Sequence, residues 1–348
     1  MSTLLYGNAV RVALADPPAF TPPYDHALAA ALARAGADVT LLTSPFRFGD
    51  VPAPQGYERR ERFYPLSSRL FRRSRARLPL KALEHLAVLR AFARVDADVL
   101  HVQWLAWPRL DARLRLRMPS VFTAHDLLPR RTAKQLDLWR TLLAKFDRVV
   151  VHSERGRERL AELGVDARVI PHPVFPSDPV RTDDGETVLA LGVIRDYKGI
   201  PDAVEATRRI GARLVVAGDR ADPVELAAPH VELRLGYLPE PELDRALGDA
   251  TVAVFPYRPE LDQSGALLRA LGAGVPAVAY DVGGIAEPVR RFAAGIVVAP
   301  GDVDGLADAL RTVLDDPERY RTGARRARDE LTWDAAATAH LALYRELG

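Results

Sequence analysis

Short apolar runs alternate with longer amphipathic segments along the whole chain. The runs are rich in Val, Leu and Ala and are too short for helices, whereas the segments between them carry Ala, Leu and Arg at helical spacing. This alternation is typical of βαβ units and mainly parallel sheets, so the predicted class is α/β. The predicted strands, six in each half, are 10–15, 39–43, 99–102, 121–124, 149–151, 169–170, 188–191, 214–217, 231–235, 252–255, 277–279 and 296–298.

A proline-rich segment separates the two halves. Residues 171–179 contain four prolines, which cannot continue a helix or a central strand. We therefore predict two Rossmann-like domains that face a cleft, with their ligands at the carboxyl ends of the strands. The predicted boundaries are an N-terminal domain (1–172), a linker (173–182), a C-terminal domain (183–331) and a final helix (332–348).

Composition excludes several classes of protein. The 348 residues are 48% hydrophobic and 27% charged, which is ample for folded cores. The chain contains no cysteine, so disulfides, thiolate metal sites and a cysteine nucleophile are excluded. The net charge of +2 does not favour nucleic acid as a partner. No secretory pattern and no apolar run of about 18 residues is present, so we expect a cytoplasmic protein.

One segment is strongly basic. Between Tyr57 and Arg94 the sequence holds eleven Arg or Lys residues and three Glu residues. Two interpretations of the part from Ser67 to Arg94 stay open: a solvated helical face, which is slightly favoured, or a surface that contacts an anionic membrane from the cytoplasmic side.

The loop after the predicted strand 188–191 suits an anion. Gly192 allows close approach of the backbone, and Arg195 and Lys198 are three residues apart, so that both can reach one diphosphate. A helix follows and adds its N-terminal dipole. A solvated loop with incidental charges is the alternative.

Two further loops follow strands of the same predicted sheet. Ser264 and Gly265 open a helix whose free N–H groups can meet a negative ligand, although an ordinary helix cap is the commoner use of such a serine. Gly283 and Gly284 lie where the next strand ends, so their amides can line the same pocket.

In the N-terminal half, His125 follows the predicted strand 121–124. This is the edge at which sheets of this kind hold ligands, and an imidazole there can donate a hydrogen bond to a substrate hydroxyl. A structural role is the commoner one for a lone histidine. His152 has the same position with less support, and His101, inside a strand, is predicted to be a core residue.

In combination these segments resemble the retaining glycosyltransferases of the GT-B fold, family 4. The resemblance covers nearly the whole chain and lies in the order and spacing of six segments: 123–126, 169–172, 192–199, 214–218, 252–256 and 274–287. It implies that the C-terminal domain binds a nucleotide-sugar donor, that the N-terminal domain binds a hydroxyl acceptor, and that the last helix packs on the N-terminal domain.

The resemblance also assigns roles to residues. It implies that Arg195 and Lys198 contact the donor diphosphate and that His125 lies near the transferred sugar; these three residues are the predicted catalytic residues. It also implies no cofactor and no metal. The predicted donor-binding residues are Gly192, Glu260, Asp262, Ser264, Gly265, Gly283, Gly284 and Glu287, and the predicted acceptor-side residues are Tyr24 and Asp25.

The sequence departs from the family pattern in two places. Family members commonly carry two glutamates eight residues apart, but here these positions are Leu261 and Arg269. Glu260 or Asp262 could reach the donor sugar instead. The usual glycine pair of the first loop is replaced by the proline-rich segment 17–25.

Two alternative functions therefore stay open: a nucleotide-sugar epimerase on the same scaffold, or a sugar-nucleotide-binding subunit without turnover. The Asp-x-Asp pairs Asp96/Asp98 and Asp302/Asp304 could suggest a metal site, but each has a structural explanation at a strand or helix start.

Overall fold

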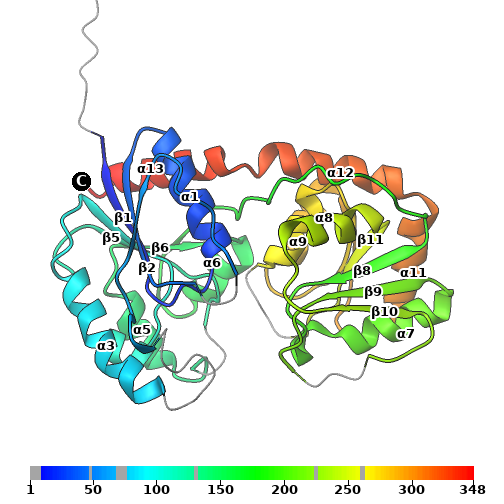
Figure 1. Ribbon diagram of the computed structural model, residues 1–348, viewed down its shortest axis with the longest axis horizontal. Coiled ribbons are helices and arrows are strands. Elements are labelled where there is room, and N and C mark those ends of the chain that lie inside the picture. Colours follow the sequence, from blue (N-terminus) through cyan, green and yellow to red (C-terminus); the bar gives the residue numbers. More distant parts are fainter. Residues whose placement is uncertain (1–8, 47–48, 68–76, 129–131, 223–225, 259–262) are drawn as a thin grey trace, which may run out of the picture. The chain divides into compact units, whose positions relative to one another are not determined.

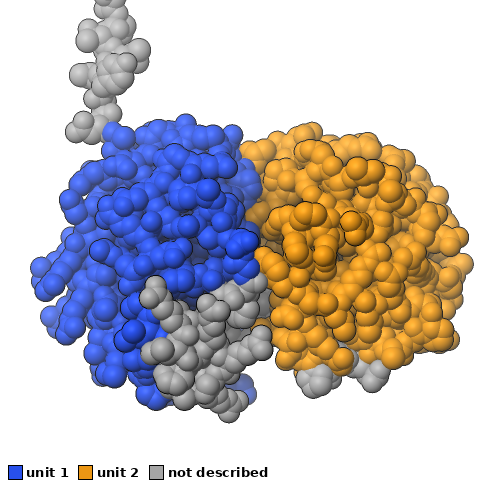
Figure 2. Space-filling model, in the orientation of Figure 1, with its two compact units in different colours: residues 1–151, 157–170, 333–348 blue, residues 152–156, 171–332 orange. Residues whose placement is uncertain are grey.

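The computed structural model describes residues 9–46, 49–67, 77–128, 132–222, 226–258 and 263–348. The described chain divides into two compact units, coloured separately in Figure 2. Unit 1 comprises residues 1–151, 157–170 and 333–348, and unit 2 comprises residues 152–156 and 171–332. Each unit is built on one sheet (Figure 1), so the predicted α/β class with two Rossmann-like sheets is confirmed.

Unit 1 contains a seven-stranded parallel sheet in the order β3-β2-β1-β4-β5-β6-β7. Its strands are β1 (Arg11–Asp16), β2 (Asp38–Thr43), β3 (Glu58–Glu61), β4 (Val99–Val102), β5 (Ser120–Thr123), β6 (Arg148–Val151) and β7 (Ala167–Val169). Its helices are α1 (Pro22–Arg34), α3 (Arg77–Phe92), α4 (Pro108–Asp111), α5 (Leu136–Leu143), α6 (Glu154–Ala161), whose first residues group with unit 2, and α13 (Trp333–Arg345).

The prediction of six strands in the first half is wrong because β3 was missed. Its sequence is entirely charged, and it forms the edge of the sheet beside β2. Neighbouring charges on each face neutralise one another: Arg59 pairs with Glu61 at 3.3 Å, and Arg60 pairs with Glu58 at 2.5 Å. An edge strand of this kind has no apolar pattern to detect.

Unit 2 contains a six-stranded parallel sheet in the order β10-β9-β8-β11-β12-β13. Its strands are β8 (Thr187–Leu191), β9 (Arg213–Gly218), β10 (Val231–Leu235), β11 (Val252–Phe255), β12 (Ala277–Tyr280) and β13 (Gly295–Val298). Its helices are η1 (Asp196–Lys198), α7 (Ile200–Ile210), α8 (Glu240–Asp249), α9 (Gly265–Gly272), α10 (Ala286–Phe292), α11 (Val303–Asp315) and α12 (Pro317–Glu330). Strands β8, β11 and β12 are fully buried, which explains their uninterrupted apolar sequences.

Helix α13 returns to unit 1 and packs beside α1 (Figure 1), which confirms the predicted crossing of the last helix. Its buried Leu341 and Tyr344 join the core that contains Leu28 of α1. The Tyr344 hydroxyl is 2.7 Å from Nδ1 of His101, which is fully buried in β4 as predicted.

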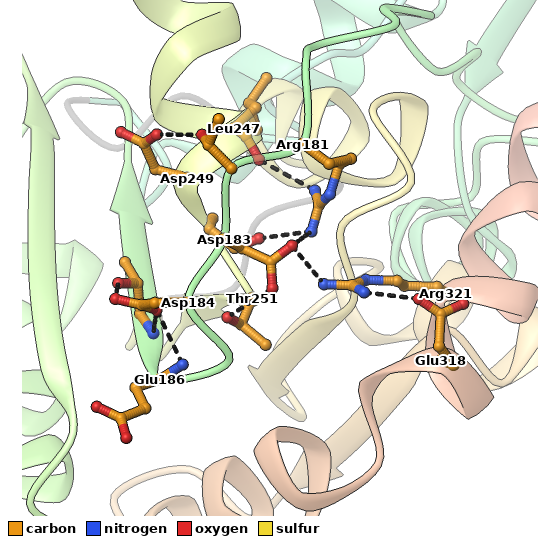
Figure 3. Close-up of polar contacts among 12 residues, drawn as sticks. Arg181, Asp183, Asp184, Glu186, Leu247, Asp249, Thr251, Glu318 and Arg321 are labelled. Atoms are coloured by element: carbon orange, nitrogen blue, oxygen red, sulfur yellow. Dashed lines mark hydrogen bonds and ion pairs between the residues drawn. The ribbon is translucent and has the colours of Figure 1, made fainter.

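The segment 174–184 is attached to unit 2 by many polar contacts (Figure 3). Arg181 donates to the carbonyl oxygens of Leu247 and Ala250, and the Thr182 amide donates to the Gly248 carbonyl. Asp183 accepts ion pairs from Arg181 at 2.9 Å and from Arg321 of α12 at 3.0 Å. Burial raises the pKa of Asp183, but these two cations outweigh it and hold the pKa below its usual value.

Candidate active site

The loop after β8 brings Gly192 and Lys198 into direct contact. Gly192 adopts φ +103°, and a Cβ there would lie 2.6 Å from the Lys198 ammonium nitrogen. Lys198 is 6% exposed, and its Nζ donates to the Leu191 carbonyl oxygen at 3.0 Å. The glycine therefore provides the space in which a buried ammonium lies at the carboxyl end of the strand.

Burial perturbs the charge of this ammonium. It lowers the pKa of Lys198 to about 8. The positive charge of Arg195 also lowers this pKa, whereas Tyr197 raises it. Arg195 itself is exposed at the start of η1, and none of the described residues accepts a hydrogen bond from its guanidinium. Both cations are therefore placed to gain from an anionic ligand, the buried one most.

A second glycine fixes this loop against the loop after β11. Gly199 adopts φ +61°, and a Cβ there would lie only 1.9 Å from the Pro256 carbonyl oxygen. The Arg258 amide donates to the Tyr197 carbonyl oxygen at 2.8 Å, which joins the same two loops. The cationic loop is thus held by main-chain packing.

Helix α9 begins beside the buried ammonium. Ser264 is 6% exposed, and its hydroxyl accepts from the Leu267 amide at 3.3 Å, so the predicted cap is confirmed. The Tyr257 hydroxyl is 3.1 Å from Ser264 Oγ, and the Lys198 ammonium lies 5.1 Å from the centre of the Tyr257 ring. Gly265 is the first residue of α9. The structure therefore brings Gly192, Lys198, Ser264 and Gly265 together.

The loop after β12 joins the same edge. Gln263 Nε2 donates to the Gly284 carbonyl oxygen at 3.2 Å, while Gln263 Oε1 is buried and meets no donor among the described residues. Gly283 adopts φ +51°. The Glu287 carboxylate accepts from the amides of Glu154 and Arg155, at 3.1 and 2.9 Å. Glu260 and Asp262, also predicted to bind the donor, lie outside the described residues.

Two further contacts of unit 2 have no signal in the local sequence. Arg258 contributes a third cation, paired with Asp202 at 2.6 Å, and Asp202 also accepts from the Tyr280 hydroxyl at 3.1 Å. Arg269, at one of the two family glutamate positions, binds Glu240 through two hydrogen bonds of 3.0 Å and lies 4.7 Å from the Phe175 ring centre. These residues are far apart in sequence, so no local pattern could have paired them.

The corresponding edge of unit 1 is aromatic. His125 Nε2 is 2.8 Å from Gln103 Oε1, and the ring stacks on Trp104 with centres 5.3 Å apart. Tyr24 meets the same ring edge-on at 4.7 Å. The structure thus brings two predicted residues, His125 and Tyr24, together with two that the sequence did not indicate.

Asp25, the other predicted acceptor-side residue, forms a buried pair with Asp16. The two side chains are 2% and 0% exposed, and a hydrogen bond joins their carboxyl groups. Asp16 accepts from the amides of Phe20 and Thr21 at 2.6 and 3.1 Å. Burial raises the pKa of Asp16 to about 6 and, with the charge of Asp16, raises the pKa of Asp25 well above its usual value. Burial therefore favours the protonated form of both carboxyl groups in this pair.

The two Asp-x-Asp pairs have structural partners. Asp96 and Asp98 bind Arg11 at 2.9 and 2.8 Å, and Asp302 caps α11 by accepting from the Gly305 amide at 2.8 Å. Across the described ranges, no group of three or more His, Asp or Glu side chains is arranged to hold a metal ion.

The two parallel sheets, one with a cationic, glycine-lined carboxyl edge, match the GT-B fold. Residues 24–178 match the family model "Glycosyltransferase Family 4", and residues 185–316 match "Glycosyl transferases group 1". The chain belongs to glycosyltransferase family 4.

Individual relatives agree with this assignment. The chain is 30% identical over 318 residues to D-inositol 3-phosphate glycosyltransferase of Mycobacterium avium, a match covering 74% of this chain and 72% of the relative. It is 36% identical over 197 residues to glycogen synthase of Mycobacterium tuberculosis, a match covering 52% of this chain and 46% of the relative. The chain thus spans only about half the length of some curated relatives it matches.

A solved structure shows the same fold. The crystal structure of Anabaena Alr3699/HepE in complex with UDP-glucose superposes with a TM-score of 0.69 at 15% identity, covering 97% of this chain and 100% of the other.

Proposed function

We propose that the protein transfers a sugar, with retention of configuration, from a nucleotide-diphosphate-sugar to the hydroxyl of an acceptor. The buried ammonium of Lys198, 3.0 Å from the Leu191 carbonyl oxygen and beside the start of α9, is the observation that carries the proposal. A buried cation with a lowered pKa gains strongly from a neighbouring diphosphate.

The unit 2 residues act on the leaving group. Lys198 and Arg195 bind the diphosphate, and the first amides of α9 add to the positive potential. As the bond from the sugar C1 to the diphosphate oxygen breaks, negative charge grows on that oxygen, and these cations stabilise it. Gly283 and Gly284 leave backbone groups available to the donor sugar.

The unit 1 residues act on the acceptor. The acceptor hydroxyl forms the new bond to C1 from the face that the diphosphate leaves, and its proton passes to the departing phosphate. His125 contacts a hydroxyl of the reacting sugars, and Tyr24 and Asp25 support the acceptor. This sequence needs no protein nucleophile and assigns no role to a metal.

Relatives support the donor class. The HepE structure contains UDP-glucose, and the two curated relatives are a glycogen synthase and an inositol phosphate glycosyltransferase.

A donor panel tests the proposal. UDP-, GDP-, ADP- and dTDP-sugars are screened for thermal stabilisation and for slow hydrolysis, in wild type and in Arg195→Ala and Lys198→Ala variants. We expect one donor to stabilise wild type and to lose most of that effect in the variants. If neither substitution weakens a confirmed donor, the diphosphate binds elsewhere.

The same panel separates the alternatives. An epimerase would convert the sugar nucleotide into an isomer of the same mass without an acceptor. Chromatographic separation of the isomeric products identifies this activity. Binding without transfer or hydrolysis would indicate a non-catalytic subunit.

We also propose that α3 contacts an anionic membrane surface. Leu78, Leu83 and Leu86 are 43%, 67% and 38% exposed on this helix, which also carries Lys81 and Arg90. No helix within the described ranges has the length and apolarity needed to span a bilayer. Apolar side chains among cations on one helix suit binding in the plane of the headgroups.

Co-sedimentation with vesicles containing phosphatidylglycerol tests this contact at low and high salt. We expect salt-sensitive binding that Leu83→Asp weakens, whereas Leu233→Asp, at a 39% exposed leucine of unit 2, serves as control. Binding that is absent at low salt would remove the proposal.

A further inference from the structure

Gln103 lies at the end of β4 in a fixed position. It is 0% exposed, and its backbone amide nitrogen donates to the Ala15 carbonyl oxygen at 2.8 Å, which continues the contact between β4 and β1. Its side chain reaches the next strand's end, where Oε1 lies 2.8 Å from His125 Nε2. Nε2 of Gln103 is also buried and meets no acceptor among the described residues, so the contact with His125 is the polar contact that the structure gives this side chain.

The chemistry of this bond fixes where the imidazole carries its hydrogen. A carboxamide oxygen can only accept, so Nε2 must donate. A neutral imidazole has a single N–H group, so the lone pair of the ring lies on Nδ1. Any group that reaches Nδ1 must therefore donate a hydrogen to it.

The plane of the ring is fixed by other residues. Trp104 stacks on it with an angle of 16° between the planes, and Tyr24 stands against it at 84°. The Trp104 indole nitrogen in turn donates to Thr21 Oγ1 at 2.7 Å. Trp104 and Tyr24 thus set the orientation of the His125 ring. Of these contacts, only the hydrogen bond with Gln103 distinguishes the two ring nitrogens.

We propose that Gln103 is a positioning residue that holds His125 as the Nε2–H tautomer, so that His125 serves its substrate as a hydrogen-bond acceptor through Nδ1. This inference rests on the proposed function for its catalytic consequence. It reverses the expectation that His125 donates to a substrate hydroxyl: the sugar hydroxyl donates, and the imidazole accepts. Substrates that present only an acceptor at that position, such as a methyl ether, are then disfavoured.

Nitrogen NMR tests the tautomer without any activity assay. In protein labelled with ¹⁵N-histidine, the His125 signals are assigned by their loss in His125→Asn. We expect wild type at pH 8 to show a protonated Nε2 and an unprotonated Nδ1. A protonated Nδ1 overturns the proposal, whether or not the protein transfers sugar.

Two substitutions separate positioning from packing. Gln103→Leu keeps the shape but removes the acceptor, so we expect a mixture of tautomers and a fall in kcat on the order of 10- to 100-fold with little change in donor KM. Gln103→Glu keeps an acceptor oxygen and should restore the Nε2–H signal and most of kcat. Gln55→Leu, an exposed glutamine of the same unit, should change neither.

The outcomes are distinct. If Gln103→Leu keeps a pure Nε2–H signal and wild-type kcat, Gln103 does not position the ring and the proposal fails. If Gln103→Leu does not fold, the wild-type spectrum and Gln103→Glu still decide. If no nucleotide-sugar is turned over, the proposed function fails, while the tautomer result stands by itself.

Discussion

The carboxyl edges of the two sheets differ although both belong to parallel sheets of similar build. In unit 2 the edge consists of backbone loops that pack at glycines and hold Lys198, Arg195 and Arg258. In unit 1 a carboxylate occupies the corresponding place: Asp16 accepts from the amides of Phe20 and Thr21, just before α1. Suitability for an anion is therefore a property of the loop residues and not of the fold.

The largest expected effect concerns the buried cation of unit 2. Lys198→Met keeps the volume but removes the charge, so we expect kcat/KM to fall by about 10²- to 10³-fold, as when one donor to a developing charge is lost. Steady-state kinetics with the donor found in the panel provide the measurement. Lys145→Met in unit 1 removes an ammonium that also bonds a carbonyl oxygen, at 3.3 Å from Leu114, and should leave kcat/KM unchanged. Equal losses in both variants would contradict the assignment.

The main-chain packing of unit 2 predicts the second effect. Gly199→Ala places a Cβ 1.9 Å from the Pro256 carbonyl oxygen, whereas Gly211→Ala, at a similar φ of +71°, meets no atom within 4 Å. We expect Gly211→Ala to lower the free energy of unfolding by about 1 kcal/mol through backbone strain alone, and Gly199→Ala to lower it by roughly 3 kcal/mol or more. Urea denaturation compares the two, and similar losses would show that the loops do not pack this closely.

The acid pair of unit 1 predicts a dependence of stability on pH. The pKa of Asp16 rises from 3.8 in the unfolded chain to about 6 in the folded protein, so the folded state binds more protons in this window. The free energy of unfolding should therefore fall by roughly 1 to 3 kcal/mol as pH rises from 4 to 7. Asp25→Asn should reduce this fall, while Asp137→Asn, whose side chain is 97% exposed, should not. An unchanged slope in Asp25→Asn would argue against the shared proton.

The smallest effect is the pH dependence of diphosphate binding. The pKa of Lys198 in the free protein is about 8, and a bound diphosphate favours its charged form. The dissociation constant of UDP should thus rise by about 10-fold between pH 7 and 9.5, because binding must then take up a proton. Calorimetry of wild type and Lys198→Arg checks this: the arginine remains charged and should give a flatter profile. A flat wild-type profile would place the diphosphate away from Lys198.

The sequence predicts those parts of the molecule whose physical cause is local. Buried parallel strands such as β8 need unbroken apolar runs, and the loop from Gly192 to Gly199 carries its glycines and cations within eight consecutive residues. Strand β3 escaped prediction because its stability comes from pairing at a solvent-exposed edge.

Contacts between distant residues could not be predicted in the same way. Gln103 meets His125 only because β4 and β5 are neighbours in the sheet, and Asp202 meets Arg258 across 56 positions of sequence. Such pairs depend on strand order and loop geometry, which the hydrophobic pattern of the sequence does not determine.

The attachment of residues 174–184 to unit 2 determines where this chain can be divided. A fragment cut at 185–316, the stretch matched by the family model, would discard Asp183 together with its partner Arg321. It would also lose the hydrogen bonds from Arg181 and Thr182 to α8 and from the Ser177 amide to the last residue of α9. A fragment of residues 171–332 keeps every one of these bonds. Chimeras that exchange unit 2 among relatives should therefore be joined after residue 170 and before residue 333, rather than within residues 174–184.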